Sequence, residues 1–192
     1  MKPEQVLKIF HQTGALLTGH FELRSGLHSA QYFQCALVLR FPDKAAALCR
    51  ALVADIKRGL GRMPRVDAVI APALGGIIVG HETARLLKVP FLFAEKQEGC
   101  LVLRRGFQIK PGMRFVVAED VITRGGRVRE TLQIVERHGG KVVAIGVIVD
   151  RSGGLVTFAY PTFSLLRMTP ITFEPGQCPL CAKGVPIDHP GS

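Results

Sequence analysis

The chain has 192 residues, of which 47% are hydrophobic, and a formal net charge of +10 at pH 7. This length suits a single domain with a sizeable core, and no uninterrupted apolar run approaches the roughly 18 residues of a membrane-spanning helix. The positive charge favours anionic partners. A polyphosphorylated small substrate explains it at least as well as nucleic acid, because two Tyr and no Trp leave few stacking platforms and no nucleic-acid-binding motif is visible.

The first third of the chain is predicted to hold two helices separated by an extended segment. Residues 3–13 carry an apolar stripe of helical period and end at a glycine. Residues 20–35 alternate too irregularly for a helix and contain a Ser-Gly turn, so a hairpin is expected there. A second helix is predicted over residues 44–60, with Asp43 as its N-cap.

From residue 66 the pattern becomes a repeat of strand, turn and helix. Helices are predicted over residues 77–87 and after residue 126, and a two-stranded ribbon over 100–103 and 107–109. Strands are predicted over residues 66–71, 90–94, 115–118 and 141–149. The alternation predicts an α/β fold with a parallel sheet and right-handed crossovers. The Pro- and Gly-rich tail from Gly176 is expected to be irregular.

The most specific pattern runs from Phe115 to Glu130. An apolar run suited to a buried strand ends at two adjacent carboxylates, Glu119 and Asp120, and a loop with Thr123 and two glycines then opens a helix. Ligands bind where parallel strands end, and a glycine turn at a helix N-terminus suits a phosphate. The acids would instead hold sugar hydroxyls or a metal ion. The expected ligand therefore carries both a phosphate and a free cis-diol.

This segment resembles the phosphoribosyl-pyrophosphate (PRPP) motif of the type I phosphoribosyltransferase family. The resemblance implies a parallel sheet flanked by helices with a small N-terminal hood, here residues 1 to about 40 plus part of the C-terminal tail, within one domain of residues 1–192. In that family the acids grip the ribose 2′- and 3′-hydroxyls and the loop cradles the 5′-phosphate. Two arginines of the loop stand where small or hydroxyl residues are more usual. The implied PRPP-binding residues of the motif are Glu119, Asp120, Val121, Ile122, Thr123, Arg124, Gly125, Gly126 and Arg127.

Two further stretches match parts of the family that contact pyrophosphate. The turn at residues 72–76 resembles a loop that binds it through backbone N–H groups, often with a non-proline cis peptide, which implies contacts from Ala73, Leu74 and Gly75. Many relatives carry lysine where Gly75 stands. Lys96 keeps a position of the family's mobile basic loop, although the residue before it, Glu95, replaces a basic one.

A third group of residues resembles the branch of the family that uses orotate. In that branch a basic residue at the Arg24 position reaches pyrophosphate, aromatics at the Tyr32 and Phe33 positions flank the base, and an arginine at the Arg151 position binds it with help from the Thr123 position. A planar two-pronged donor suits a carboxylate. Taken alone, these residues would equally pass as core aromatics and as an arginine closing a strand.

The resemblance implies that the 5-phosphoribosyl group of PRPP is transferred to orotate, giving orotidine 5′-monophosphate and pyrophosphate in pyrimidine biosynthesis. Lys96, Glu119 and Asp120 would be the catalytic residues. Mg²⁺ would be required but bound mainly through PRPP, with no direct side-chain ligand assigned. Family members are usually homodimers, and neither nucleic acid nor a membrane is an expected partner. The alternatives are a purine phosphoribosyltransferase and a PRPP-sensing regulator that binds nucleic acid.

The five cysteines, an odd number, do not indicate a disulfide framework. Together with an N-terminus that lacks the apolar core of a signal peptide, this predicts a cytoplasmic location. Cys178 and Cys181 form a CxxC pair, but no second pair follows at zinc-knuckle spacing, and His189 or a dimer-related pair would have to complete a site. A structural turn is favoured; zinc and a redox pair are the alternatives. Surface or capping roles are expected for His11, His20, His81 and His138.

Residues 95–99 match the family's mobile basic loop but keep only one of its basic residues, Lys96. The nearest other cations are Arg104 and Arg105, and we hypothesise that they take the place of the missing basic residues. Replacing both by alanine should sharply raise the PRPP concentration that the enzyme requires, because charge-assisted contacts to phosphate would be lost. Steady-state kinetics with varied PRPP would measure this, and unchanged kinetics would remove both residues from the site.

Overall fold

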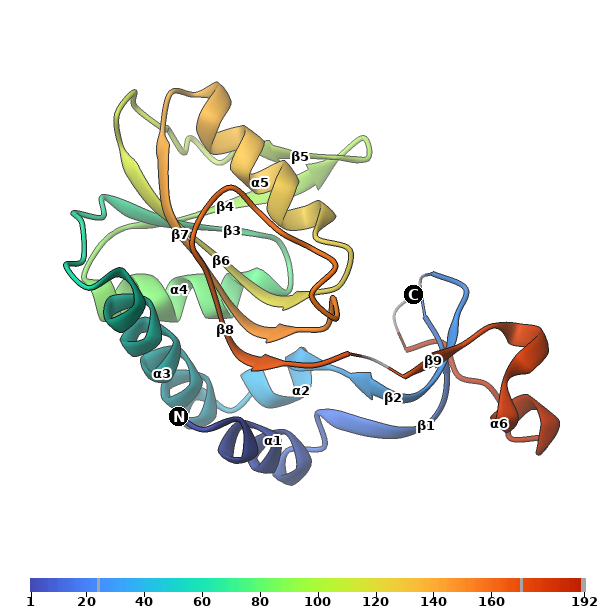
Figure 1. The fold of residues 1–192 in the computed structure, drawn as a ribbon. Coiled ribbons are helices and arrows are strands. Elements are labelled where there is room, and N and C mark those ends of the chain that lie inside the picture. The colour runs from blue at the N-terminus through green and yellow to red at the C-terminus, as the bar shows by residue number, and fades with distance from the viewer. Residues whose placement is uncertain (24, 170, 191–192) are drawn as a thin grey trace.

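A computed structural model describes residues 1–23, 25–169 and 171–190 of the chain. Figure 1 shows a larger sheet with helices on both of its faces and a smaller sheet beside it, formed by segments near the two ends of the chain. The larger sheet has six strands in the order β5-β4-β3-β6-β7-β8. All neighbours are parallel except β5, which is antiparallel to β4. The strands are β3 (Ala68–Pro72), β4 (Phe91–Gln97), β5 (Cys100–Leu103), β6 (Arg114–Ile122), β7 (Lys141–Asp150) and β8 (Thr162–Arg167).

The central strands are buried on both faces, as their continuous apolar runs predict. Along β6, Val116 and Ala118 belong to the core on one face, while Phe115 and Val117 belong to the core on the other. Helices α3 (Pro42–Leu60) and α4 (Gly76–Leu87) contact one face, and α5 (Gly126–Arg137) contacts the other. The predicted parallel α/β fold is confirmed. No helix in the described part of the chain combines the length and apolar character needed to cross a membrane.

The smaller sheet, which we call the hood sheet, joins the two ends of the chain. Its strands β1 (Leu16–Glu22), β2 (His28–Phe33) and β9 (Thr172–Phe173) are antiparallel, in that order. Helix α1 (Pro3–Gln12) precedes it and contacts β8, and α2 (Cys35–Leu39) leads from β2 toward α3. A 3₁₀ turn (Pro175–Gln177) and α6 (Pro179–Ala182) follow β9, after which Asp188 pairs with Phe21 of β1.

Three expectations about local structure were wrong. Helix α3 begins at Pro42 with Phe41 at its N-cap, so Asp43 lies in the first turn; a proline at the first helical position needs no N–H partner. Strand β5 pairs with β4 through residues 94–97, not with residues 107–109, because the chain reverses at Glu98 and Gly99. The tail from Gly176 is not irregular throughout, since it holds α6 and returns to the hood sheet.

Candidate active site

Two adjacent carboxylates lie at the C-terminal end of β6, between the ends of β3 and β7. Glu119 is 5% exposed, and its Oε1 accepts a hydrogen bond from the backbone N–H of Asp120 at 3.0 Å. The Asp120 Oδ1 accepts one from the N–H of Val121 at 2.8 Å. The two acids are thus held by the backbone of their own strand end, and no salt bridge joins either of them to a cation among the described residues.

The turn after β3 packs directly against this acid pair. A Cβ added to Gly75 would lie 2.8 Å from both carboxylate oxygens of Asp120, and one added to Gly76 would lie 3.0 Å from Glu119 Oε1. The peptide bond between Ala73 and Leu74 is cis, and the N–H of Ala73 donates to the carbonyl of Ala94 at 2.7 Å. The Gly75 position therefore admits no side chain as the acids stand, and the backbone of this turn and the acids share one edge of the sheet.

Burial sets the electrostatics of the acid pair. It raises the pKa of Glu119 well above the usual value, and the neighbouring Asp120 raises it further, while Arg127 acts more weakly in the opposite direction. Burial also raises the pKa of Asp120. The site holds two carboxyl groups whose ionised forms the protein itself stabilises poorly. Hydroxyl donors or a cation supplied by a ligand would stabilise them, as the predicted diol or metal contact requires.

The glycine loop opens α5 beside the acids. Gly125 has φ of 73° and is the N-cap of the helix, a conformation that favours glycine. An added Cβ there would also meet Val156 Cγ1 at 2.6 Å. Arg129 Nη1 donates to the carbonyl of Arg124 at 2.7 Å, which fixes the loop from within the helix. Thr123 and Arg124 are exposed, so the loop offers a hydroxyl, a guanidinium and helix N-terminal N–H groups to solvent.

On the side of β7, Arg151 lies against the hood. Its Cζ is 5.8 Å from the ring centroid of Tyr32 and 5.4 Å from that of Phe33. The residue is 7% exposed, and its Nε is buried without a hydrogen-bond partner among the described residues. Burial lowers the pKa of this guanidinium. A buried donor left unsatisfied is costly, so the geometry calls for an acceptor from a ligand.

Cys35 connects these two parts of the site. Its Sγ lies 3.9 Å from the carbonyl oxygen of Asp120, and it follows Phe33 by two residues. Burial, together with the charges of Asp120 and Glu119, raises the pKa of its thiol well above normal, while Arg151 opposes that shift. The thiol is therefore a neutral spacer between acids and arginine. Sequence reasoning missed this residue, because a single cysteine after an aromatic pair carries no motif.

Among the described residues, no hydrogen bond or ion pair joins Lys96, Arg104 or Arg105 to the acid pair. Lys96 is exposed on β4, two residues beyond Ala94. Glu95 forms ion pairs with Arg105 at 3.0 Å and with Arg104 at 3.6 Å, so both arginines have a carboxylate partner on the β4–β5 hairpin. Arg24 lies outside the residues that the structure describes.

Comparison with known proteins identifies the family. A family model described as the phosphoribosyl transferase domain matches residues 42–169. The orotate phosphoribosyltransferase of Pelotomaculum thermopropionicum is 50% identical over 100% of this chain and 98% of that protein. The orotate phosphoribosyltransferase of Carboxydothermus hydrogenoformans is 49% identical over 96% of this chain and 95% of its own. The chain belongs to the orotate phosphoribosyltransferase family.

Solved structures share the fold of this orotate phosphoribosyltransferase family member. The orotate phosphoribosyltransferase of Aeropyrum pernix superposes with a TM-score of 0.70 at 24% identity, over 85% of this chain and 93% of that one. The adenine phosphoribosyltransferase of Rhodothermus marinus gives a TM-score of 0.64 at 19% identity, over 86% and 99%. Because enzymes named for different bases share the architecture, the fold alone does not select the base.

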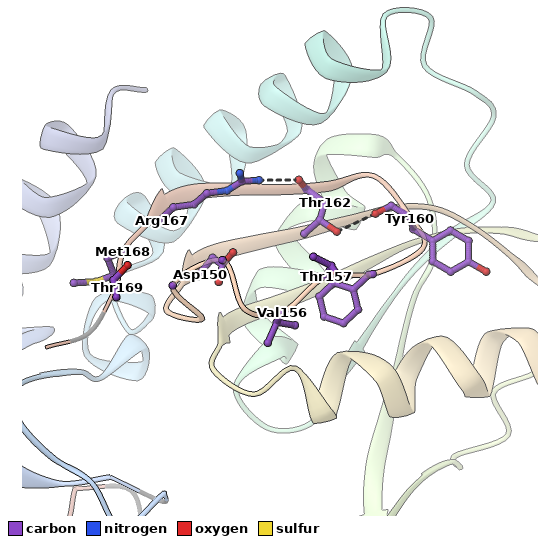
Figure 2. Close-up of a pocket in the computed structure, with 11 residues that line it drawn as sticks. Asp150, Val156, Thr157, Tyr160, Thr162, Arg167, Met168 and Thr169 are labelled. Carbon is purple, nitrogen blue, oxygen red and sulfur yellow. Dashed lines mark hydrogen bonds between the residues drawn. The ribbon is translucent and has the colours of Figure 1, made fainter. Parts of the chain in front are cut away.

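A cavity of about 460 Å³ lies beside the family's site, between the loop after β7 and strand β8. Figure 2 shows Val156 and Thr157 on one wall and Arg167 and Thr162 on the other. Asp150, which precedes Arg151, lines it, but none of the described residues predicted to bind PRPP or orotate does. The acids, the glycine loop and Arg151 thus lie outside this cavity.

The raised pKa of Glu119 makes a prediction about stability. Between the ordinary pKa of a glutamate and the raised value, the folded protein binds more protons than the unfolded chain, so wild-type stability falls as pH rises through that window. Glu119→Gln should remove this loss and increase the free energy of unfolding near neutral pH by on the order of 1 kcal/mol. The advantage should vanish at pH below the ordinary pKa.

Urea unfolding of the ligand-free protein at stepped pH would measure this difference. Glu98→Gln, an exposed position on the β4–β5 hairpin, is the matched control and should show no such pH-dependent gain. A Glu119→Gln variant less stable than wild type near neutral pH would contradict the assignment of an unfavourable buried charge.

Proposed function

We propose that this chain transfers the 5-phosphoribosyl group from PRPP to orotate, giving orotidine 5′-monophosphate and releasing pyrophosphate. One observation carries the choice of base: the buried Arg151 guanidinium, whose Nε has no hydrogen-bond partner in the described part of the chain, faces Tyr32 and Phe33. A flat ring that bears a carboxylate would stack on the aromatics and accept hydrogen bonds from the guanidinium. Relatives that are named orotate phosphoribosyltransferase and match the full chain support the same reading.

PRPP would bind along the ends of β3 and β6. The carboxylates of Glu119 and Asp120 would accept hydrogen bonds from the ribose 2′- and 3′-hydroxyls, which offsets their buried charge. The loop 123–127 would hold the 5′-phosphate through its N–H groups, Thr123 and its two arginines. Backbone groups of residues 73–75, which pack on the acids, would contact the pyrophosphate. Lys96 and Arg24 are proposed to add charge to that end.

Orotate would then occupy the space between the hood and the end of β7. Tyr32 is half-buried and Phe33 is buried, so together they offer a wall held in place by the core. Thr123 is exposed at the end of β6 and is proposed as a further contact to the base. The Cys35 thiol, two residues after Phe33, lies 3.9 Å from the Asp120 carbonyl oxygen, which supports a base site next to the proposed ribose contacts.

Catalysis would rest on positioning and charge, because no described side chain at this edge is an evident nucleophile. Holding the ring nitrogen of orotate in line with the anomeric carbon converts a bimolecular step into an intramolecular one. As pyrophosphate departs, the ribose gains oxocarbenium character, and the carboxylates of Glu119 and Asp120 lie where they would stabilise positive charge. Cations at the opposite end would stabilise the leaving group.

Magnesium suits the donor chemistry of this edge, and we propose it as the cofactor. Glu119 and Asp120 present hard carboxylate oxygens that lack a cation partner among the described residues. Most of the ligands of the ion would come from PRPP itself, with these acids nearby. When bound, the ion would neutralise charge on the pyrophosphate.

We also propose a homodimer. Apolar side chains are exposed in the turn that approaches the acids and in the helix that follows it: Leu74 is 83% exposed and Ile78 43%. Phe41, before α3, is 36% exposed. A groove of about 400 Å³ is lined by the end of α2, the start of α3 and the first half of α4, and Ile78 is one of its lining residues. Apolar exposure beside a functional turn is typical of a contact surface between subunits. A single-chain mass by light scattering at assay concentrations would contradict this.

Two further proposals concern organisation and location. The hood, residues 1 to about 40 with part of the tail, and the larger sheet would act as one domain, because Arg151 of the sheet end packs on aromatics of the hood. All five cysteines are described and all are free thiols, which suits the reducing cytoplasm. Protease digestion that released a stable hood fragment, or recovery from a non-cytoplasmic fraction, would contradict these proposals.

The proposed activity predicts consumption of orotate only when PRPP and magnesium are both present. A spectrophotometric assay would compare orotate with adenine, hypoxanthine, xanthine and uracil under the same conditions. Orotate should be the preferred base. Faster turnover of a purine would assign the chain to a purine phosphoribosyltransferase, and PRPP binding without turnover of any base would favour a regulatory role.

Arg151→Met should raise the KM for orotate about 10- to 100-fold, because a charge-assisted hydrogen bond contributes about 1.5–3 kcal/mol. The affinity for PRPP should change little. Arg167→Met is the matched control: this exposed arginine on neighbouring β8 pairs with Asp150 in register but has its own partners, Ser164 and Thr162. An unchanged KM for orotate in Arg151→Met, with the variant folded by circular dichroism, would remove this arginine from the base site.

A further inference from the structure

Four potential metal ligands gather where α6 meets the hood sheet. His20 lies on β1, His28 on β2, and Cys178 and Cys181 flank the first turn of α6. One ligand atom from each lies within 4.8 Å of all the others. None of the four was predicted to contact PRPP or orotate. The cluster therefore joins two segments that are far apart in the sequence: His20 and Cys178 are separated by 158 positions.

Four distances within the cluster lie at or below the edge lengths of a tetrahedral site, and no two ligand atoms are more than 4.8 Å apart. His20 Nε2 lies 3.0 Å from His28 Nδ1 and 3.4 Å from Cys178 Sγ. Cys181 Sγ lies 3.7 Å from His20 Nε2 and 3.3 Å from His28 Nδ1. With Zn–N bonds of about 2.0 Å and Zn–S bonds of about 2.3 Å, the edges of a tetrahedral N₂S₂ site are roughly 3.3–3.8 Å. The side chains thus surround a centre of the right size for one ion.

The backbone orients His20 for metal binding. Its Nδ1 lies 2.8 Å from the carbonyl oxygen of Val185, and a carbonyl can only accept, so the proton resides on Nδ1. This leaves the Nε2 lone pair directed at the cluster. A metal-bound histidine commonly donates its other N–H to a carbonyl in this way. The Val185 N–H in turn donates to the carbonyl of Leu180, which ties the orienting group to α6.

Burial separates this cluster from an ordinary surface group. His20 is 3% exposed, His28 6% and Cys178 3%, and only Cys181 is exposed. The expectation that His20 is a surface or capping residue was therefore wrong. The two cysteines are free thiols, so no disulfide explains their convergence. A redox pair would need the cysteines alone, whereas here two buried imidazoles converge on the same point.

We propose that His20, His28, Cys178 and Cys181 bind one zinc ion in a closed, structural site. Two imidazoles and two thiolates in a tetrahedral arrangement are the donor set that favours zinc over hard cations such as magnesium. All four positions are filled by protein, which leaves none open for a substrate or a reactive water. The site is thus separate from the magnesium proposed above, and it does not depend on the proposed reaction.

The zinc ion would fasten the C-terminal tail to the hood. Apart from the ion, polar contacts hold the tail to β1. His20 Nδ1 donates to the carbonyl of Val185 at 2.8 Å, the N–H of Asp188 donates to the carbonyl of His20 at 2.8 Å, and the N–H of Glu22 donates to the carbonyl of Asp188 at 2.9 Å. His189 Nδ1 also lies 3.4 Å from Glu22 Oε2. The other tail strand, β9, has two residues paired with β2. Strand β2 also carries Tyr32 and Phe33, so the ion would stabilise the sheet that presents the base wall.

The direct test is metal analysis of the purified full-length protein. Elemental analysis after dialysis should find one zinc per chain, and protein grown or reconstituted with cobalt should show the intense visible bands of tetrahedral Co²⁺ with thiolate ligands. A thiol-reactive mercurial should release the zinc. Removal of the ion should lower the unfolding temperature. Protein without zinc that also gives no tetrahedral cobalt spectrum would overturn the proposal.

Single variants show which side chains hold the ion. Cys181→Ser, at the exposed ligand, should lose zinc and the cobalt–thiolate bands, and His28→Gln should do the same. Cys100→Ser, an exposed cysteine on β5, is the matched control and should keep both. If a ligand variant fails to fold, the cobalt spectrum of the wild type still decides. Full zinc retention in Cys181→Ser, or a Cys178–Cys181 disulfide in freshly isolated protein, would contradict the site.

Discussion

The burial of two neighbouring carboxylates at the end of β6 is the constraint on which the rest of the site depends. Ionised acids in a buried position are unfavourable unless a partner compensates them, and the described residues supply no ion pair for Glu119 or Asp120. The free-energy cost of burying these acids persists because the strands around them are packed on both faces, so the acids cannot move into solvent without disrupting the core. In the proposed complex, the hydroxyl groups of the ribose, accompanied by a cation, would lower this cost.

The proposed base site also depends on a buried charged group, here the guanidinium of Arg151. Arg151 lies at the end of β7, where it would be an ordinary strand-end cation if the hood did not cover it. The rings of Tyr32 and Phe33 stabilise its charge through their faces, but its Nε has no hydrogen-bond partner among residues 1–23, 25–169 and 171–190. In the proposed function, the larger sheet would provide the phosphate and ribose contacts, and the hood would select the base through the two aromatic side chains that it packs on Arg151. Structural similarity to enzymes named for adenine as well as orotate agrees with that division.

The hood sheet is built from segments at both ends of the chain, so its stability depends on the contacts that join them. It has three strands, one of which, β9, has only two residues, so the sheet buries little on its own. Helix α1 packs it on β8, the tail returns along β1, and the proposed zinc ion would join β1, β2 and α6 at one point. Small assemblies with little core commonly depend on such a cross-link.

The sequence by itself determined the parallel α/β fold, the order of most elements, and the acid pair with its glycine loop. They could be predicted because they are local: apolar periodicity and a contiguous motif can each be recognised within about 15 residues. Strand β8 and the pairing of β5 were missed because an isolated short strand carries little periodic signal. Only the tertiary structure decided that Arg151 meets Tyr32 and Phe33, that Cys35 touches Asp120, and that His20 and His28 meet Cys178 and Cys181. Those contacts join residues more than 80 positions apart, and no local pattern can specify them because chain packing alone brings such residues together.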